Sequence, residues 1–139
     1  MTVATAEENT PWAAPVYYVY QEGGFYFFSD PRSRHIVESQ ASGRSAASVH
    51  VAANTWKDIR GLQMSGHIRR VSIGPESARA LAAYLKKFPF TSEFFSSGAP
   101  LKVEDFKQRF NVRLYAFIPE RVYYLDNRVR FGFREKVDL

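Results

Sequence analysis

The segment FFSDPRSRH, residues 27–35, gathers side chains that could bind an anion. Ser29, Ser33, Arg34 and His35 follow an aromatic run and stand at the start of a stretch with helical spacing. The first N–H groups of a helix are free donors and carry the positive end of the helix dipole. Hydroxyl and guanidinium groups add further hydrogen bonds, so these four residues are candidate phosphate ligands.

The same segment also fits a purely structural interpretation. Asp30 followed by Pro31 predicts a helix that starts near Pro31, with Asp30 as its cap and the N–H groups of Arg32 and Ser33 free. Asp30 and Ser33 could then act only as caps, and the Asp30 carboxylate would repel a bound phosphate. These residues alone leave anion binding and helix capping both open.

Other chemistries find little support among the residue types. The chain has no cysteine, which excludes disulfides, thiolate nucleophiles and cysteine metal sites. Its three histidines, His35, His50 and His67, lack the spacing of metal ligands, and no G-x-S-x-G motif marks a serine nucleophile. The sequence therefore predicts no metal site, and no side chain stands out as a catalytic acid or base.

Arginines and aromatic residues alternate between Arg128 and Arg134, a pattern that also suits stacking on bases and pairing with a nucleic acid backbone. The segment lacks the glycine that follows the basic residue in RNA-recognition motifs, and the chain lacks their βαββαβ order. An alternating strand at a subunit interface explains the same residues. Nucleic-acid binding is the more remote of the two interpretations.

The elements that would position these residues are mostly strands. Apolar and aromatic runs separated by turn residues predict strands at Val3–Thr5, Trp12–Tyr20, Phe25–Ser29, Ser45–Ala52, Asp58–Ser72, Phe110–Ile118, Arg121–Asp126 and Val129–Phe133. Helical spacing predicts helices from Pro31 to about Ser42 and at Ser77–Phe88, with helical turns at Ser92–Ser97 and Val103–Arg109. Short hairpin connections favour antiparallel pairing, so we expect a mostly β or α+β domain that closes into a barrel or sandwich.

Length and composition predict one domain over residues 1–139. Hydrophobic residues fill 45% of the chain and aromatic residues 16%, enough for a core rich in strands. The net charge of +5 comes from scattered basic residues and is compatible with an anionic ligand. We expect a cytoplasmic protein without a membrane segment, because no signal-peptide pattern and no run of about 18 apolar residues occurs.

Three segments, taken in order, resemble the pyridoxamine 5′-phosphate oxidase-like family of FMN-binding split barrels. The first is PWAAPVYYVY followed by GGFYFFSDPRSRH, the second is IRGLQMSGHIRRV, and the third is VYYLDNRVRFGFRE. Together they cover nearly the whole chain and resemble a small bacterial branch of that family. The resemblance implies an antiparallel split β-barrel with two to three helices. It also implies a homodimer that holds two FMN molecules in clefts between its subunits.

The resemblance also implies which residues meet the cofactor. The phosphate would lie at the strand-to-helix turn, and the isoalloxazine ring would meet the backbone of one strand and a polar side chain of another. The matching positions are Phe28, Ser29, Ser33, Arg34 and His35 for the phosphate side, and Pro15, Val16, Tyr17 and Gln63 for the ring.

Two positions and one missing signature depart from the oxidases. His35 stands where they have lysine, and Ala14 stands where they have a phosphate-binding arginine. Their C-terminal substrate signature is not recognisable, so oxidation of pyridoxine phosphate is not expected. The expected function is a flavin-dependent oxidoreductase that transfers hydride or electrons between bound FMN and a small-molecule substrate. A non-catalytic flavin- or anion-binding module, or the same fold with deazaflavin or haem, remains an alternative.

Overall fold

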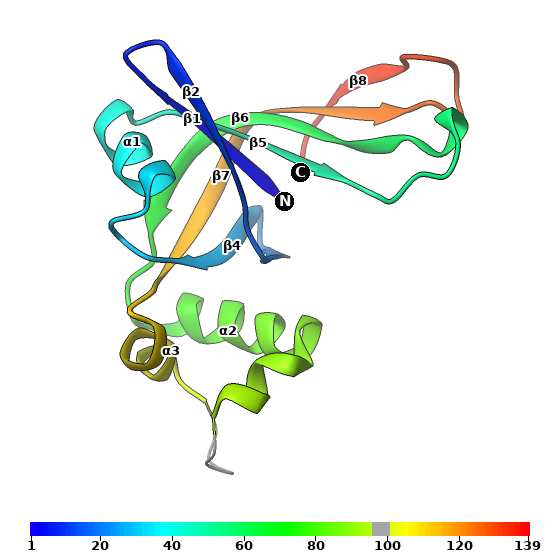
Figure 1. The fold of residues 1–139 in the computed structure, drawn as a ribbon. Coiled ribbons are helices and arrows are strands. Elements are labelled where there is room, and N and C mark those ends of the chain that lie inside the picture. The colour runs from blue at the N-terminus through cyan, green and yellow to red at the C-terminus, as the bar shows by residue number, and fades with distance from the viewer. Residues whose placement is uncertain (96–100) are drawn as a thin grey trace.

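The computed structural model describes residues 1–95 and 101–139, which form one antiparallel sheet with helices on its flanks (Figure 1). The strands are β1 Thr2–Glu7, β2 Thr10–Pro15, β3 Tyr18–Gln21, β4 Gly24–Ser29, β5 Ser45–His50, β6 Arg60–Arg70, β7 Arg113–Asp126 and β8 Arg134–Val137. The helices are α1 Arg34–Ser42, α2 Pro75–Lys87 and α3 Val103–Phe110, with short 3-10 helices η1 Trp56–Asp58 and η2 Pro89–Phe94.

The sheet runs in the order β2-β1-β5-β6-β7-β4-β3, and β8 pairs with β7 beyond the end of β4. Neighbouring strands pair antiparallel throughout, as the hairpin connections predict. The paired β5–β6 and β7–β8 segments extend from the compact half as a long arm that ends near η1 (Figure 1). Among the described residues, no helix is long and apolar enough to cross a membrane.

Strand β4 separates two apolar cores because both of its faces are covered. Phe25 and Phe27 point into the first core, which fills the inside of the curved sheet and is closed by Ile36 of α1. Tyr26 and Phe28 point the other way, into the second core between the sheet and α2 and α3. Figure 1 shows α2 and α3 as a layer beside β4, on the side away from α1. The end of β4 therefore lies at the junction of both cores.

The predicted helices are present. Ser77–Phe88 corresponds to α2, and Gly43 ends α1 with a φ of 66°, a left-handed conformation that favours glycine. The predicted turn at Val103–Arg109 is α3. The predicted turn at Ser92–Ser97 begins within η2, and its residues 96–97 lie outside the described part of the chain.

The predicted strand Trp12–Tyr20 is in fact two strands. Residues up to Pro15 pair with β1 as β2, whereas β3 pairs with β4, so the chain crosses between neighbours at Val16 and Tyr17. β2 is an edge strand, which is where proline is tolerated because its missing N–H breaks no ladder.

The predicted pair of strands Phe110–Ile118 and Arg121–Asp126 is wrong. Residues Arg113–Asp126 form one continuous strand, β7, which pairs with β6 along nearly its whole length. Pro119 is a residue type that often occurs in turns. The register of the β6–β7 pair shifts beside Gly66 of β6, which forms a β-bulge. This bulge lets the hydrogen-bonded pairing of β6 and β7 continue past the proline.

The predicted strand Val129–Phe133 is also wrong, since this segment is the loop between β7 and β8. The Asn127 side chain holds it in place: its Oδ1 accepts a hydrogen bond from the Gly132 N–H at 3.0 Å, and its Nδ2 donates to the Trp56 carbonyl at 2.8 Å. These contacts between distant segments outweigh the alternation of apolar and basic residues in the loop.

Candidate functional site

The turn between β4 and α1 differs from its predicted form in where the helix begins. The N-cap is Ser33 and the first helical residue is Arg34, so the predicted start at Pro31 is wrong. The Asp30 carboxylate accepts hydrogen bonds from the Arg32 N–H at 2.8 Å and from the Arg32 guanidinium at 3.0 Å. The Ser33 N–H donates to the Asp30 carbonyl at 3.0 Å. Both N–H groups that were expected to be free are therefore occupied, because Asp30 closes a local turn of its own.

Ser29, Ser33 and His35 come together at this turn. Ser29 Oγ lies 2.9 Å from His35 Nε2 and 3.0 Å from Ser33 Oγ, and Ser33 Oγ donates to the Asp30 carbonyl at 2.7 Å. The end of β4 places Ser29, and the start of α1 places the other two. The cluster thus presents two hydroxyls and one imidazole at the N-terminal end of a helix.

Burial favours the neutral form of His35. Its side chain is buried, and burial lowers the pKa of the imidazole below its ordinary value of 6.5, while the nearby Glu38 acts weakly in the opposite direction. A neutral imidazole still offers one N–H donor and one acceptor. His35 can therefore serve as a hydrogen-bond partner at this turn without carrying a charge.

Arg34 points away from the cluster, toward β2. Its Nε donates to Glu38 in an ion pair, and its guanidinium lies 4.9 Å from the centre of the Trp12 ring. Glu38 is buried and also accepts a hydrogen bond from Thr5 Oγ1 at 2.6 Å. The hydrogen bonds from Thr5 and Arg34 lower the pKa of Glu38 and keep it ionised. Arg34 thus ties α1 to the first hairpin.

The other predicted residues occupy three different places. The Phe28 ring stacks on Phe106 with centroids 4.5 Å apart, inside the second core, so its side chain does not join Ser29. The N–H of Val16 donates to the Met1 carbonyl at 2.9 Å, and Pro15 ends β2 in register with Thr2. The Tyr17 ring is exposed and its edge contacts Phe88 and Phe90.

Gln63 lies on the outer face of β6, where its Oε1 accepts a hydrogen bond from Arg134 Nη1 at 3.0 Å. Gln63 is in register with Tyr123 of β7, whereas Ser29 is in register with Arg113, ten residues earlier on the same strand. At roughly 3.3 Å per residue, the ten residues of β7 between these positions trace a path of about 33 Å. Within one chain, Gln63 and Ser29 therefore neighbour different parts of β7.

Arg113 is a residue that the sequence did not single out. It begins β7 beside Ser29, it is half buried, and its charge helps to lower the pKa of Asp30. Arg70 at the end of β6 lies in register with Tyr115, and both arginines act on that phenol. No local pattern marks these two cations, because only the pairing of β4, β6 and β7 brings them to one end of the sheet. Within residues 1–95 and 101–139, no group of histidine and acidic side chains could hold a metal ion.

The curved antiparallel sheet, with its helix-start cluster and its long arm, has the architecture of a split β-barrel. Residues 1–126 match the family described as pyridoxamine 5′-phosphate oxidase, and the chain belongs to that family. A curated relative, the UPF0306 protein YhbP of Salmonella paratyphi A, is 31% identical over 134 residues, which cover 95% of this chain and 80% of the relative.

Solved structures share the fold. A heme binding protein from Mycobacterium smegmatis superposes with a TM-score of 0.71 and 17% identity, over 98% of this chain and 51% of that protein. The present chain thus spans about half the length of that structure. A FAD-binding protein from Mesorhizobium loti superposes with a TM-score of 0.62 and 16% identity, over 87% of this chain and 80% of that chain. These matches confirm the expected split barrel.

Proposed function

We propose that the protein binds FMN and uses it as a flavin-dependent oxidoreductase. The observation that carries the proposal is the cluster of Ser29, Ser33 and His35, whose polar atoms lie within 3.4 Å of one another at the start of α1. Membership of the pyridoxamine 5′-phosphate oxidase family and the likeness to a FAD-binding protein support a flavin as the ligand.

The residues at the turn fit a phosphate. The Ser29 hydroxyl and the His35 imidazole can donate hydrogen bonds, and the first N–H groups of α1 add the positive end of the helix dipole. The Ser33 hydroxyl would donate to the phosphate by turning its proton away from the Asp30 carbonyl. The Asp30 carboxylate no longer opposes an anion, because Arg32 is hydrogen-bonded to it. Arg113 supplies a cation beside Ser29 in place of Arg34. When bound, FMN would supply hydride or electron transfer at its ring.

The distance between Ser29 and Gln63 supports a homodimer. Gln63 of the same chain lies ten residues farther along β7 than the turn, a path of about 33 Å along the strand. A ring contact from Gln63 would therefore come from a second copy, as the family resemblance implies. The substrate would enter the cleft that the two chains share, and a small-molecule electron donor or acceptor would react there.

The test is a visible absorption spectrum of the purified protein before and after addition of FMN and desalting. We expect retained flavin bands at about one flavin per chain, and reduction of the bound flavin by NADH or NADPH. A protein that stays colourless would contradict the FMN proposal. If FMN binds but neither NADH nor NADPH reduces it, the result would favour a non-catalytic flavin-binding module over an oxidoreductase.

Two substitutions test the turn itself. Ser29→Ala and Ser33→Ala each remove one hydroxyl, and each should weaken FMN binding by about 1.5–3 kcal/mol, the cost of a hydrogen bond to a charged group. Ser42→Ala at the other end of α1 is the matched control, since its hydroxyl contacts only the Glu38 and Arg44 backbone. If Ser29→Ala and Ser33→Ala bind FMN as tightly as the Ser42→Ala control, the phosphate does not bind at this turn.

Haem is the second candidate ligand. The heme binding protein from Mycobacterium smegmatis has the same fold over 98% of this chain. A Soret band after reconstitution with haemin, without retention of FMN, would favour this alternative. Deazaflavin would use the same phosphate-binding turn, and competition with FMN would reveal it.

A further inference from the structure

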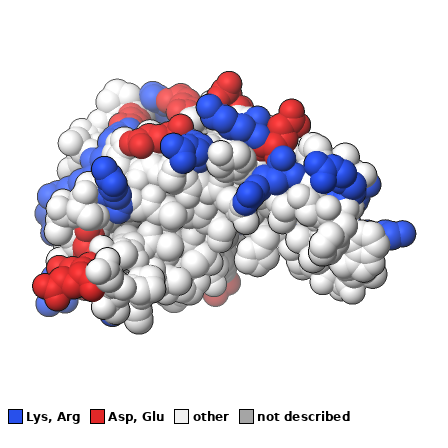
Figure 2. Space-filling model, turned by 90° about the horizontal axis from the view of Figure 1, so that it is seen from above, with Lys and Arg blue, Asp and Glu red and all other residues white. Residues whose placement is uncertain are grey.

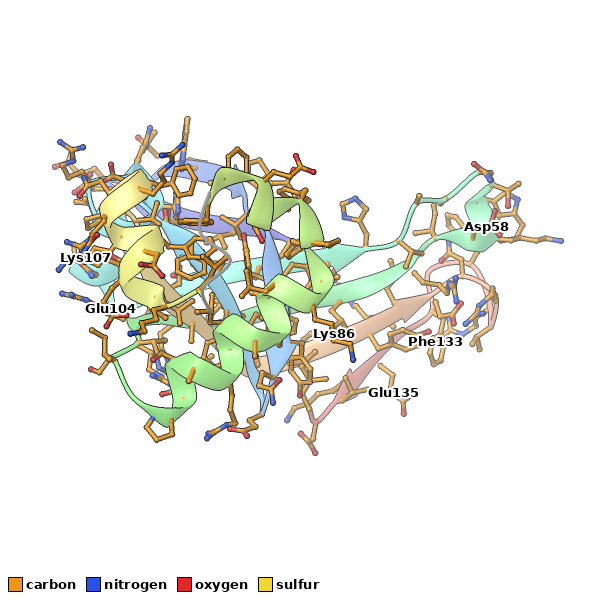
Figure 3. The ribbon with its side chains drawn as sticks, turned by 90° about the horizontal axis from the view of Figure 1, so that it is seen from below. Asp58, Lys86, Glu104, Lys107, Phe133 and Glu135 are labelled. Carbon is orange, nitrogen blue, oxygen red and sulfur yellow. The ribbon has the colours of Figure 1, made fainter. Side chains whose placement is uncertain are left out.

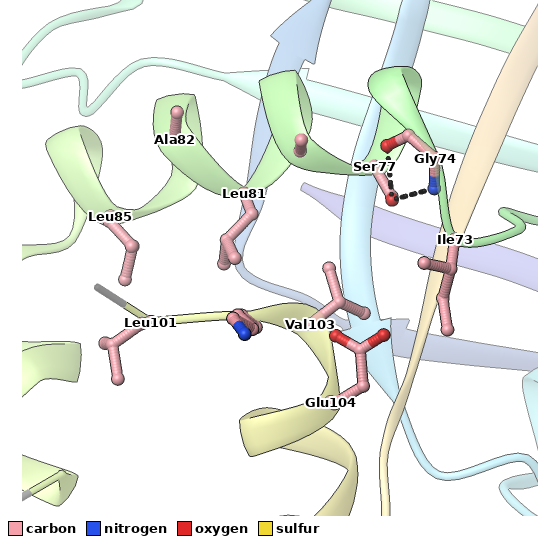
Figure 4. A pocket seen from close by; sticks show the side chains of 11 residues that line it. Ile73, Gly74, Ser77, Leu81, Ala82, Leu85, Leu101, Val103 and Glu104 are labelled. Atoms are coloured by element: carbon pink, nitrogen blue, oxygen red, sulfur yellow. Dashed lines mark hydrogen bonds between the residues drawn. The ribbon is translucent and has the colours of Figure 1, made fainter. Parts of the chain in front are cut away.

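A small pocket lies on the arm, where β6 and β7 run side by side. Its volume is about 220 Å³, and Gln63, Ser65, Arg121 and Tyr123 are among the residues that line it. We call it the arm pocket. A larger and mainly apolar cavity of about 430 Å³ lies between α2 and α3 (Figure 4), and the two cavities share no residue. The arm pocket is therefore a separate and more polar site.

Strand register places the four side chains of the arm pocket on one face of the sheet. Gln63 is in register with Tyr123, and Ser65 is in register with Arg121. Residues that face each other across an antiparallel pair point to the same side. Met64, between Gln63 and Ser65, points into the first core, so the pocket lies on the outer face of the arm. The four side chains are thus direct neighbours on an exposed surface.

Arg134 reaches the arm pocket from β8 and fixes the orientation of the Gln63 amide. Its Nη1 donates a hydrogen bond to Gln63 Oε1 at 3.0 Å, and its guanidinium lies 5.4 Å from the centre of the Tyr123 ring. A guanidinium group has donors and no acceptor, so the amide oxygen must face Arg134. The amide NH₂ group is thereby turned away from Arg134, and it donates to no other residue in the described part of the chain. Gln63 therefore offers N–H donors to a ligand.

Arg121 has no acidic partner. No ion pair within 4.0 Å involves this arginine among residues 1–95 and 101–139. The adjacent carboxylate, Glu120, is bonded to His67 Nδ1 at 2.9 Å. Glu135 is in register with Tyr124 and so points to the opposite face of the arm. The whole guanidinium fork of Arg121 is available to a ligand.

Two further charges near the arm pocket offset each other. Lys136 is in register with Tyr123 and lies on the same face. Asp138 follows two residues later and forms no ion pair within 4.0 Å with any described residue. The positive charge at the pocket therefore comes from Arg121 and Arg134, and Arg134 is already engaged by Gln63.

We propose that the arm pocket binds the carboxylate group of a small molecule. Arg121 can form the paired hydrogen bonds that a planar carboxylate accepts from a guanidinium. The Gln63 amide and the Ser65 hydroxyl add donors beside it. One free guanidinium matches the single charge of a carboxylate better than the two charges of a phosphate dianion.

The carboxylate would belong to the substrate of the oxidoreductase, and this step rests on the proposed function. There, Gln63 of a second copy meets the flavin ring. Arg121 lines the same pocket as Gln63, so a carboxylate held by Arg121 would bring its molecule beside that ring. The substrate class is then a small carboxylic acid.

The experiment measures acetate binding to the full chain by amide chemical shifts, at constant ionic strength. We expect saturable shifts at the Gln63 side-chain NH₂ group, Ser65 and Tyr123. Arg121→Gln should weaken acetate binding at least about tenfold, since it removes charged hydrogen bonds. Lys86→Gln removes one positive charge from the exposed side of α2 and should leave the affinity unchanged (Figure 3). A well-dispersed spectrum shows that each variant is folded, and Arg121→Lys, which keeps the charge but loses the fork, should also bind acetate less tightly than wild type.

Equal acetate affinity in wild type and Arg121→Gln, or shifts confined to residues 29–35, would overturn the proposal. Inorganic phosphate that binds at the arm pocket more tightly than acetate would also overturn it, because the pocket would then select a dianion.

The assignment of the carboxylate to the substrate has its own readout. In protein that retains FMN, saturating acetate should shift the visible flavin spectrum of wild type but not that of Arg121→Gln. A retained flavin whose spectrum does not respond would overturn the substrate class. A protein that retains no FMN would overturn the proposed function, whereas acetate binding at the arm pocket would still be measured by the amide shifts.

Discussion

Single side chains of the β4–α1 turn take their roles from their nearest partners. Asp30, which would repel a phosphate on its own, is hydrogen-bonded to Arg32. Arg34, which looks like a phosphate ligand, instead pairs with the buried Glu38. The hydroxyls of Ser29 and Ser33 and the imidazole of His35 are left to meet an anion. Phosphate binding at this turn would thus depend on neutral donors and the helix dipole more than on a formal charge within the motif.

The buried imidazole of His35 predicts a pH dependence of stability. Burial lowers its pKa in the folded protein below 6.5, so the unfolded chain takes up a proton first as the pH falls. The titration of His35 therefore does not change the free energy of unfolding above about pH 6.5. That free energy decreases as the pH falls from about 6.5 toward the pKa of His35 in the folded protein. Urea unfolding at about pH 7.5 and pH 5.5 should show a larger loss for wild type than for His35→Gln, which cannot titrate. Equal losses would show that His35 contributes nothing to the pH dependence.

Strand β7 is the element that organises the molecule. It pairs with β6, β4 and β8, and it carries residues of both cores, such as Tyr115 and Leu114. Its passage through Pro119 depends on the bulge beside Gly66. A Cβ atom at Gly66 would lie 2.0 Å from the Ile118 carbonyl oxygen, so only glycine fits there without movement of the backbone.

Replacement of this glycine tests the bulge. Gly66→Ala should lower the free energy of unfolding by about 1–3 kcal/mol, the usual cost of overpacking. Ser65→Ala, one residue earlier on the exposed side of β6, is the control and should change it by no more than about 0.5 kcal/mol. Denaturant titrations measure both. A Gly66→Ala protein as stable as the control would mean that β6 and β7 can separate at the bulge without cost.

The whole molecule combines a compact barrel with an arm that has little core of its own. At the end of the arm, Trp56 and Phe131 contact each other edge to face, yet their exposed fractions are 51% and 77%. Figure 2 shows charges of both signs along the rim of one face and a broad area without charged side chains at its centre. Depletion of charge is typical of the centre of an interface, so both features favour association of two chains.

Sedimentation equilibrium should therefore give the mass of two chains. Loss of large exposed apolar surface drives such association, so the dimer should persist in high salt. Phe131→Glu should shift the equilibrium toward the single chain, whereas Phe131→Leu should not. A monomer at all concentrations would contradict the homodimer, and with it the idea that Gln63 of a second copy completes the flavin site.

The sequence alone determined the type of most elements and the composition of the turn. The helix that ends at about Ser42, the helix at Ser77–Phe88 and the strand at Phe25–Ser29 were all predicted, because backbone conformation and periodicity act over a few residues. The family resemblance, carried by short motifs in order, gave the split barrel. The group of Ser29, Ser33 and His35 was predictable for the same reason, since all three lie within one local turn.

Only the tertiary structure decided which distant groups meet. The partner of Arg34, the continuity of β7 past Pro119 and the placement of Arg70 and Arg113 at one end of the sheet all depend on strand pairing between segments far apart in the sequence. Register is set by the burial of whole faces and by bulges, and no local pattern encodes it.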